Sequence, residues 1–405
     1  MARFQDYAPD QAWLLPPRIS DELGEEHLAC FLHEAVERMD LSRFEAVYSD
    51  EGRPAYPPEL MLKVWLYAYA VGVTSSRKLE QRIREDLGFR FLAGSLKPDH
   101  WTLNEFRRRH GRALNDVFTQ VVETAQKLGL GRLGRVAIDS TRVEAEASPD
   151  RSDTVEQLRR ERARIRQRIR RWQQQCDRDD EPTGGVAAAP ADWRRRLEEI
   201  PQQLEQLRRS GQKRSSRRDP ESRYLRRRSG FCLGYTGEIA VSDDHFIVAQ
   251  RVHQAATDHH SLVVMTEAVK QECGAYPTAV LADCGYHSTE QIATVEGLDV
   301  ETYVPDACLA RELANATPAG QMNKRQRRRS PGLHARRKRL RGPTGRTAMA
   351  RRKALVESVF GVLKQQRGMR RFRRRGLAAV SVEWTLATTA YNLTRLYNRR
   401  QAVAS

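Results

Sequence analysis

Three acidic residues have the types and surroundings that metal-dependent phosphoryl transfer requires. Asp139 and Asp283 each end a short apolar run, Val-Ala-Ile-Asp139 and Ala-Val-Leu-Ala-Asp283. Glu357 is the only acid in residues 324–375, a stretch with 21 Lys and Arg residues. Carboxylates on rigid elements bind Mg²⁺, and two such ions can activate the attacking oxygen and stabilise the leaving oxygen at a phosphate. We therefore expect these side chains to hold two Mg²⁺ ions, with Mn²⁺ as a substitute.

Each acid also has a structural interpretation that the sequence leaves open. An aspartate at a strand end is often a turn former or a helix cap. Glu357 has Lys353 four residues earlier on the same helix, but an ion pair in that orientation would contribute only roughly 0.2–0.5 kcal/mol. A lone carboxylate in so basic a segment is better explained as a metal ligand.

The basic side chains after Glu357 are spaced along one side of a helix. Lys364 follows Glu357 by seven residues and shares its face, and Arg367, Arg371 and Arg374 continue that side. Arginine binds phosphate through two N–H groups, so phosphates are expected to lie beside the metal site. The residues predicted to make these contacts are Lys353, Lys364, Arg367 and Arg371.

Hydrophobic periodicity predicts the elements that position the acids. The two apolar runs are interpreted as buried strands with Asp139 and Asp283 at their ends, where an α/β sheet presents side chains to a site. Asp258 is predicted to cap a helix, and residues 306–350 are predicted to be a basic loop. The further predicted elements are strands over 231–241, 245–252 and 300–304 and helices over 262–272, 289–295, 353–366 and 380–399. This order indicates an α/β fold with a mixed sheet flanked by helices.

Residues 1–130 are predicted to be an all-helical domain. Apolar spacing indicates helices over 59–71 and 77–85, and Thr102 with Glu105 matches a capping box that would begin a third helix. That helix would turn Leu103, Phe106 and His110 inward and Arg107, Arg108 and Arg109 outward. A basic helix after tight turns is typical of a helix-turn-helix module, with Arg107 and Arg108 as DNA contacts. The alternative is a helical bundle with a solvated basic face.

Residues 151–214 are predicted to be an inserted helical hairpin. Residues 155–175 and 192–209 are rich in Arg, Gln and Glu, with sparse apolar positions at helical spacing. The sequence Asp-Asp-Glu-Pro-Thr-Gly-Gly between them interrupts a helix. The hairpin is either a coiled coil or a pair of solvated helices. Its role is left open between bridging two protomers and clamping flanking DNA.

Composition restricts the partner and the compartment. The 405-residue chain has 70 Lys and Arg against 52 Asp and Glu, a net charge of +18, which favours a polyanionic partner. Charge alone does not distinguish DNA from RNA, the ribosome or an anionic membrane. No uncharged apolar stretch of about 18 residues occurs, and the first residues lack the apolar segment of a signal peptide. The six cysteines are scattered, which argues against zinc sites and disulfides, so we expect a cytosolic protein without a membrane partner.

Several motifs together resemble the DDE transposases of bacterial insertion sequences. Tyr56-Pro-Pro-Glu-Leu-Met-Leu-Lys and Thr102-Leu-Asn-Glu-Phe-Arg-Arg-Arg-His resemble the InsH-type N-terminal module. Ala137-Ile-Asp-Ser-Thr resembles the first-aspartate motif, and Leu281-Ala-Asp-Cys-Gly-Tyr-His-Ser resembles the second. Val356-Glu-Ser-Val-Phe-Gly-Val-Leu-Lys resembles the glutamate helix with its signature lysine. The resemblance covers nearly the whole chain, and the last two motifs together are specific.

The resemblance implies a catalytic triad of Asp139, Asp283 and Glu357 in an RNase H-like core that depends on Mg²⁺. It implies double-stranded DNA as the partner, in the form of inverted-repeat ends and target DNA. Synapsis of two ends implies a homodimer or a larger assembly that acts at the nucleoid in the cytoplasm. The expected divisions are a DNA-binding or dimerisation domain (1–130), the catalytic core (131–150 and 215–400), the hairpin (151–214) and the basic loop (306–350).

Two positions depart from the family pattern. Some relatives have Tyr-x-x-Arg ahead of the glutamate, where this chain has Ala350 and Lys353. The residue after the glutamate is often a histidine in this branch, and this chain has Ser358 there. Neither departure removes a metal ligand. The remaining alternatives are a catalytically inactive DNA-binding derivative, an RNase H-fold nuclease acting on RNA or branched DNA, and an RNA-binding protein without metal dependence.

Overall fold

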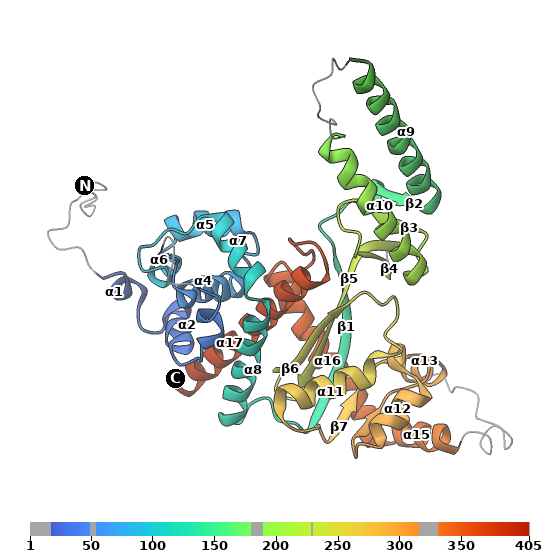
Figure 1. The fold of residues 1–405 in the computed structure, drawn as a ribbon. Coiled ribbons are helices and arrows are strands. Elements are labelled where there is room, and N and C mark those ends of the chain that lie inside the picture. The colour runs from blue at the N-terminus through green and yellow to red at the C-terminus, as the bar shows by residue number, and fades with distance from the viewer. Residues whose placement is uncertain (1–17, 49–53, 180–188, 228–229, 316–330, 405) are drawn as a thin grey trace, which may run out of the picture.

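The computed structural model describes residues 18–48, 54–179, 189–227, 230–315 and 331–404. Helices make up the N-terminal part and surround a mixed sheet, and a helical hairpin projects from one end of that sheet (Figure 1). Among the described residues, no helix is long and apolar enough to cross a membrane. The arrangement confirms the predicted α/β class with an all-helical N-terminal region.

The N-terminal helices form around α4, which follows Pro57 and has Pro58 in its first turn. Its side chains are buried around the whole circumference, so α4 is the centre of the bundle. Asp99, and not the predicted Thr102, caps α7, because its carboxylate accepts the N–H of Thr102 at 2.7 Å. The helices are α1 (Ile19–Leu23), α2 (Leu28–Glu37), α3 (Ser42–Glu45), α4 (Pro58–Ala70), α5 (Ser76–Glu85), α6 (Leu87–Leu92), α7 (His100–Arg109) and α8 (Gly111–Lys127).

A six-stranded mixed sheet forms the centre of the remaining chain. Its order is β4-β5-β1-β7-β8, and β6 pairs with the other half of β5. β1 is antiparallel to β5 and parallel to β7, which is parallel to β8. The strands are β1 (Arg135–Glu144), β4 (Arg223–Arg227), β5 (Gly230–Ser242), β6 (Ile247–His253), β7 (Ala279–Leu281) and β8 (Glu301–Tyr303). The sheet with its flanking helices confirms the RNase H-like prediction.

β1 is longer than predicted, so Asp139 lies in the middle of a strand and not at its end. β5 pairs with β1 continuously from Val136 to Glu144, which keeps the chain extended beyond the apolar run. The prediction assumed that the strand ends where the apolar run ends, at Asp139. β1 instead continues to Glu144. Asp283 follows the last residue of β7 by two positions, close to its predicted place.

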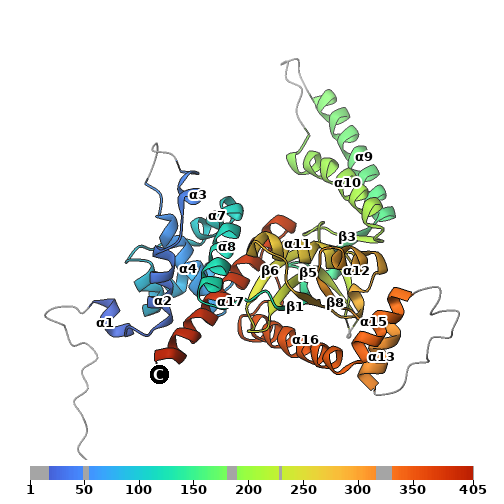
Figure 2. The same ribbon diagram turned by 90° about the horizontal axis from the view of Figure 1, so that it is seen from below.

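Helices cover both faces of the sheet. α11 (Ser261–Cys273) and α12 (Thr289–Glu296) lie on one side, and α16 (Pro343–Gly361) lies on the other (Figure 2). The last helix, α17 (Leu377–Ala404), packs against β6 and also against α4 and α8. The N-terminal helices and the sheet therefore contribute to one hydrophobic cluster. The predicted stripe on α17 is buried, namely Val380, Trp384, Ala387 and Tyr391.

The prediction of a basic loop over residues 306–350 is wrong for the described part. This region contains α13 (Ala307–Asn315), α15 (Pro331–Arg341) and the first turns of α16, while residues 316–330 lie outside the described residues. Arginines of this region form ion pairs with acids that are distant in sequence. Arg337, for example, donates two hydrogen bonds of 2.7 Å to Asp306. Leu340 and Ala348 pack with the ends of β7 and β8 in a small second core. The basic composition of this segment suggested an exposed loop. The helices form because distant acids pair with its arginines and a small core buries its apolar side chains.

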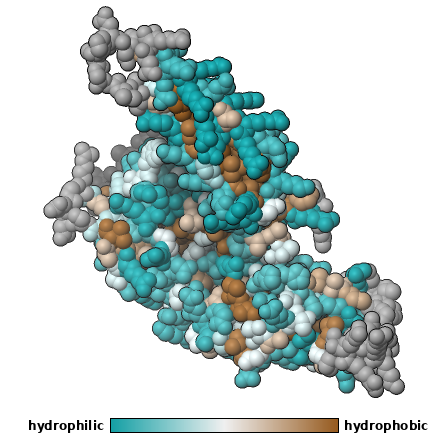
Figure 3. Space-filling view, turned by 45° about the vertical axis from the view of Figure 1, so that its right-hand side comes forward, coloured by the Kyte–Doolittle hydropathy of each residue, from teal (hydrophilic) through white to brown (hydrophobic). Residues whose placement is uncertain are grey.

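The inserted hairpin is confirmed and has an apolar seam of its own. α9 (Val155–Asp179) and α10 (Ala191–Ser210) lie side by side, and β2 (Ser152–Thr154) pairs with β3 (Arg214–Ser216) at the base. Figure 3 shows narrow hydrophobic stripes on the hairpin among hydrophilic side chains. The buried members of the seam are Leu158, Ile165, Ile200 and Leu207.

Arg107 does not face outward as predicted, because α17 covers that side of α7. Its side chain is 2% exposed, and its guanidinium lies 3.8 Å from the ring centroid of Trp65. It donates to the hydroxyl of Tyr69 at 2.9 Å and to the carboxylate of Glu383 at 3.4 Å. Arg107 therefore joins the helical bundle to α17. Arg108 is exposed as predicted.

We predict that Arg107→Met lowers the free energy of unfolding by about 3–5 kcal/mol, because it leaves the buried Glu383 carboxylate without its cation. Urea unfolding followed by circular dichroism measures this change. The double variant Arg107→Met, Glu383→Leu should recover much of the loss, since both charges are then removed. Arg108→Gln, on an exposed neighbour, should leave the midpoint nearly unchanged. Equal effects of Arg107→Met and Arg108→Gln would contradict the buried ion pair.

Candidate active site

Asp139 lies on β1, and Asp283 lies just beyond the end of the neighbouring parallel strand β7, at a matching position. Ala137 of β1 pairs with Leu281 of β7, and each aspartate follows its paired residue by two positions. Parallel strands in register bring such residues to the same place on the sheet. The charge of Asp283 also raises the pKa of Asp139, as expected for carboxylates at close range.

A tight turn orients Asp283. The residue caps the short 3₁₀ helix Cys284–Tyr286, and its Oδ1 accepts the N–H of Gly285 at 2.8 Å. A Cβ atom at Gly285 would lie 3.0 Å from that Oδ1 and 3.8 Å from Oδ2 of Asp258. The Asp-x-Gly-Tyr motif therefore needs a small residue where two carboxylates approach the backbone.

Arg352 of α16 forms an ion pair with Asp139, with 3.2 Å between Nη1 and Oδ2. Burial raises the pKa of Asp139 to about 6, Arg352 acts against that change, and the charges of Asp283 and Asp258 add to it. The site therefore gathers hard oxygen donors and negative charge where water has little access. Such a donor set suits Mg²⁺ or Mn²⁺, so Asp139 and Asp283 fit the predicted metal ligands.

Asp258 is a third aspartate beside this pair, and its predicted role as a helix cap is wrong. α11 begins after His260, and the side chain of Asp258 instead accepts the hydroxyl of Ser140 at 2.9 Å. Its other oxygen lies 3.3 Å from Nη1 of Arg142. The loop after β6 folds back onto β1, which places Asp258 beside the residue that follows Asp139. An aspartate that precedes a helix looks the same in the sequence whether it caps that helix or contacts a distant strand. The sequence therefore contained no sign that Asp258 contacts β1.

Glu238, His253 and Asp258 have ligand atoms within 4.8 Å of one another, but their hydrogen bonds argue against a metal. Nδ1 of His253 accepts the N–H of Ala255 at 3.0 Å, so the ring proton must sit on Nε2. That nitrogen faces Oε2 of Glu238 at 3.3 Å and has no lone pair for a cation. The hydroxyl of Tyr286 donates to Oε1 of Glu238 at 3.0 Å. The buried Glu238 therefore anchors the turn that carries Asp283, a function that the sequence did not indicate.

A second group with metal-ligand spacing, His33, Glu37 and Glu59, lies on the N-terminal helices. Nζ of Lys63 lies 2.7 Å from Nδ1 of His33 and also contacts Glu59. The ammonium group already supplies the positive charge at this place, so the group needs no metal to balance its acids.

Glu357 is on the helix that crosses β1, but its side chain is exposed. Arg352, five residues earlier, contacts Asp139, and Lys364, seven residues later, contacts the main-chain oxygen of Arg142. Glu357 thus lies on the segment that passes over the aspartates. Among the described residues, the three predicted ligands do not form a group with all ligand atoms within 4.8 Å. The alternative role of Glu357, an ion pair with Lys353, is also not observed within the described part of the chain.

The predicted phosphate contacts are divided by a break in the helix. α16 continues into the π-helical segment Val362–Gln366, which changes the direction of the side chains that follow. Lys364 is half-buried, and burial lowers its pKa to about 8. Arg367 is 4% exposed, with its guanidinium 5.5 Å from the ring centroid of Tyr391. The prediction that Arg367 contacts phosphate is therefore wrong.

The other predicted contacts remain on the surface. Arg371 is exposed and pairs with Glu144 at 2.9 Å, and Lys353 is exposed. Arg374 is half-buried and donates to the main-chain oxygen of Arg107 at 3.3 Å. Only part of the predicted basic face is thus accessible to phosphates.

Two regions of the chain match models of known protein families. A family model described as a transposase domain matches residues 17–109, and a model described as a transposase DDE domain matches residues 205–393. The second match contains Asp283 and Glu357, while β1 with Asp139 lies outside it and pairs with β5 and β7 inside it. No curated protein and no solved structure matches the chain.

The raised pKa of Asp139 predicts a pH dependence of stability for the metal-free protein. In the unfolded chain this carboxyl ionises near its ordinary value, and in the folded protein it ionises near pH 6, so its contribution to stability is lost as the pH rises through that interval. Asp139→Asn removes this titration. Between pH 4 and 7, the variant should gain about 2 kcal/mol of unfolding free energy relative to the wild type. Urea unfolding at each pH measures the free energy of unfolding. If its pH dependence is the same in the wild type and in Asp139→Asn, the raised pKa does not belong to Asp139.

Proposed function

The chain is a transposase of the DDE class, and from this premise we propose that it cleaves terminal-repeat DNA and joins the freed 3′ hydroxyl ends to target DNA. The observation that carries the proposal is the proximity of Asp139, on β1, to Asp283, which follows the parallel strand β7 by two residues. Their coupled charges and low exposure suit hard divalent cations. Such a protein works on the chromosome, at the nucleoid in the cytoplasm.

Asp139, Asp283 and Glu357 would hold two Mg²⁺ ions, for which Mn²⁺ would substitute. When bound, these ions activate the attacking oxygen and stabilise the charge on the leaving oxygen. Arg352 favours the ionised form of Asp139, so this ligand is charged at neutral pH. Glu238 holds the turn of Asp283 through Tyr286. Lys364 and Arg371, beyond Glu357 in the chain, supply positive charge for the phosphates.

In the proposed sequence, water first attacks the phosphodiester at the element end and releases a 3′ hydroxyl. That hydroxyl then attacks a phosphate of target DNA at the same site, which joins the two DNAs. Since two ends must react together, we propose that the working form is a homodimer or a larger assembly. The division into a helical N-terminal domain (1–130), a catalytic core (131–150 and 215–400) and a hairpin (151–214) is proposed on the same grounds.

We predict that Asp139→Asn, Asp283→Asn and Glu357→Gln each reduce cleavage of duplexes carrying the inverted repeats that flank the gene. The expected loss is at least about a hundredfold, because each change removes a charge that stabilises the transition state. Gel analysis of end-labelled DNA with Mg²⁺ measures it, and Glu290→Gln, at an exposed acid of α12, is the matched control for Glu357→Gln. If Glu357→Gln cleaves like the control, Glu357 is not the third ligand.

The same assay separates the rival functions. Binding of end DNA without cleavage by the wild type would identify a catalytically inactive derivative. Cleavage of branched DNA or RNA hybrids without joining would identify an RNase H-fold nuclease. Residues 17–109 favour the transposase, because a nuclease of that kind leaves this domain unexplained.

Metal binding is also testable without DNA. We predict that Mg²⁺ or Mn²⁺ raises the melting temperature of the wild type, since a ligand at a hundred times its Kd adds about 2.7 kcal/mol to stability. Asp139→Asn and Asp283→Asn should abolish this rise, whereas His33→Ala, in the group that contains Lys63, should retain it. Thermal unfolding with and without the ions measures the shift. An equal shift in all four proteins would locate the metal elsewhere.

A further inference from the structure

The inserted hairpin carries a dense group of exposed arginines on α9. Five arginines occur in the eight residues 164–171, and the sequence has no acid between Glu161 and Asp177. All five side chains are exposed. We call this group the hairpin arginine cluster, which consists of Arg164, Arg166, Arg168, Arg170 and Arg171.

Two acids near the base of the hairpin, Glu161 and Asp153, bind arginines outside the cluster. Arg196 of α10 binds Glu161 through two N–H groups at 2.9 and 3.0 Å. Arg217 binds Asp153 in the same way at 2.6 and 2.8 Å. Among the side chains that the structure describes, which exclude those of residues 177–188, no salt bridge reaches a member of the cluster. The cluster therefore keeps its full positive charge.

Such an arrangement is unfavourable for an isolated helix. Arg164 and Arg168 are four residues apart, as are Arg166 and Arg170, and like charges at this spacing destabilise a helix by roughly 0.2–0.5 kcal/mol per pair. Arginines that are neither paired nor packed gain most from a bound polyanion, because each can fork onto a phosphate. The charge pattern thus favours a nucleic-acid backbone over a neutral protein surface.

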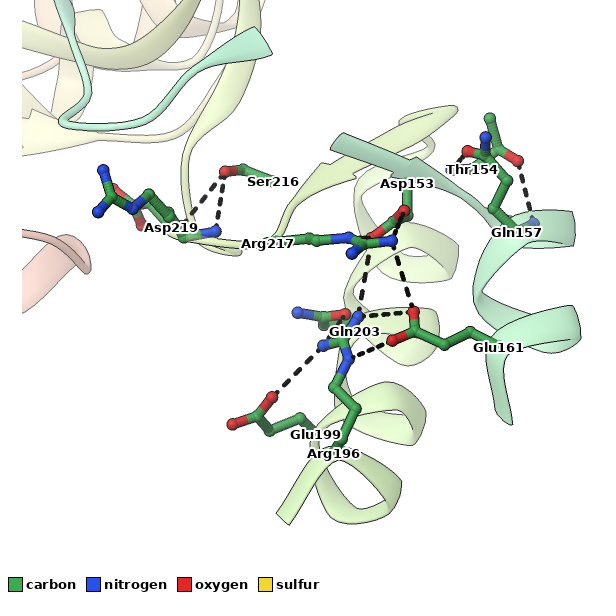
Figure 4. A network of polar contacts seen from close by, with 11 residues as sticks. Asp153, Thr154, Gln157, Glu161, Arg196, Glu199, Gln203, Ser216, Arg217 and Asp219 are labelled. Atoms are coloured by element: carbon green, nitrogen blue, oxygen red, sulfur yellow. Dashed lines mark hydrogen bonds and ion pairs between the residues drawn. The ribbon is translucent and has the colours of Figure 1, made fainter. Parts of the chain in front are cut away.

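An apolar seam and a group of ion pairs at the base fix the position of the helix that carries the cluster. Figure 4 shows the side chains of Glu161, Arg196 and Arg217 meeting where α9, α10 and β3 converge, with Asp153 beside them. The apolar seam between α9 and α10 continues toward the cluster, because Ile165 and Ile169 belong to it. Arg164 and Arg168 line a hollow of about 850 Å³ beside Trp193. The arginines are therefore carried by α9, which packs against α10 and is joined by ion pairs to the base of the hairpin.

The hairpin also extends from the strand that carries the first aspartate. β1 continues five residues from Asp139 to Glu144, about 17 Å of extended chain. The cluster begins nine residues into α9, roughly 14 Å along that helix. Figure 1 shows the hairpin projecting away from the sheet beyond this end of β1. Laid end to end, the two segments measure roughly 30 Å, with residues 145–154 between them, and this length corresponds to about ten base pairs of duplex.

We propose that the hairpin arginine cluster binds the phosphate backbone of duplex DNA about ten base pairs from the phosphodiester at the active site. The inference rests on the proposed function, because that function places DNA at Asp139. It assigns the insertion to DNA contact and not to the bridging of protomers. The contact reads no bases, since arginines on an exposed helix face bind phosphates without sequence information.

The test compares two double variants that remove the same charge from the same hairpin. Arg164→Gln with Arg168→Gln removes two unpaired members of the cluster. Arg208→Gln with Arg209→Gln removes two arginines of α10 that both pair with Glu205. The probes are two synthetic duplexes with the inverted repeat that flanks the gene, one ending about five and one about twenty base pairs from the cleavage site. Binding is measured by fluorescence anisotropy without divalent cations, over a range of salt concentrations.

The cluster variant should bind the long duplex roughly tenfold more weakly, with the slope of log K against log salt reduced by about 2, because two phosphate contacts are lost. It should bind the short duplex like the wild type, and the Arg208, Arg209 variant should match the wild type on both. Circular dichroism confirms that the helices are retained.

Three outcomes would overturn the proposal. One is unchanged binding of the long duplex by the cluster variant, and another is equal weakening by both variants, which would indicate net charge alone. The third is a loss of self-association at unchanged DNA affinity, which would assign the cluster to a second copy of the chain. Because binding is measured without cleavage, a protein that binds through the cluster but does not cleave would refute only the proposed function.

Discussion

The pairing of β1 with β5 and β7 is the constraint on which the other features depend. It places Asp139 in the middle of a strand and near Asp283, which follows the end of the parallel neighbour β7. Burial at this position raises the pKa of the Asp139 carboxyl, and Arg352 of α16 acts against that rise. The same strand leads into the inserted hairpin. One element therefore links the acids, the helix that crosses them and the arginine-rich hairpin.

The N-terminal helices are fixed to this sheet by buried contacts. α17 packs on β6 and on α4 and α8, and the ion pair of Arg107 with Glu383 joins α7 to the same helix. A buried ion pair stabilises a fold less than well-packed apolar residues would, but breaking it is costly, so it makes the arrangement specific. The match of residues 17–109 to a transposase domain thus concerns a region that is joined through α17 to the sheet carrying Asp139. Its contact with DNA stays a prediction.

The positive charge of the chain divides into two populations that the total of +18 hides. Arg107, Arg352 and Arg367 are largely buried and act on acids or aromatic rings inside the protein. The arginines of the hairpin cluster are exposed and have no acid partner in the described part of the chain. Only the second kind is available to a polyanion. Counting basic residues therefore overestimates the unpaired positive charge on the surface near Glu357, where several of these side chains are buried or paired.

The sequence by itself determined the fold class, the helical N-terminal region, the hairpin and most strands and helices around the sheet, because these follow from local periodicity and turn residues. It also singled out Asp139 and Asp283, whose motifs are local. Tertiary structure alone decided which arginines are buried, how far β1 extends, and that residues 331–350 are helical. It also decided that Asp258 and Glu238 support the site. Those features depend on partners that are distant in the chain, such as α17 for Arg107 and β5 for β1, and a local pattern carries no information about what will cover it.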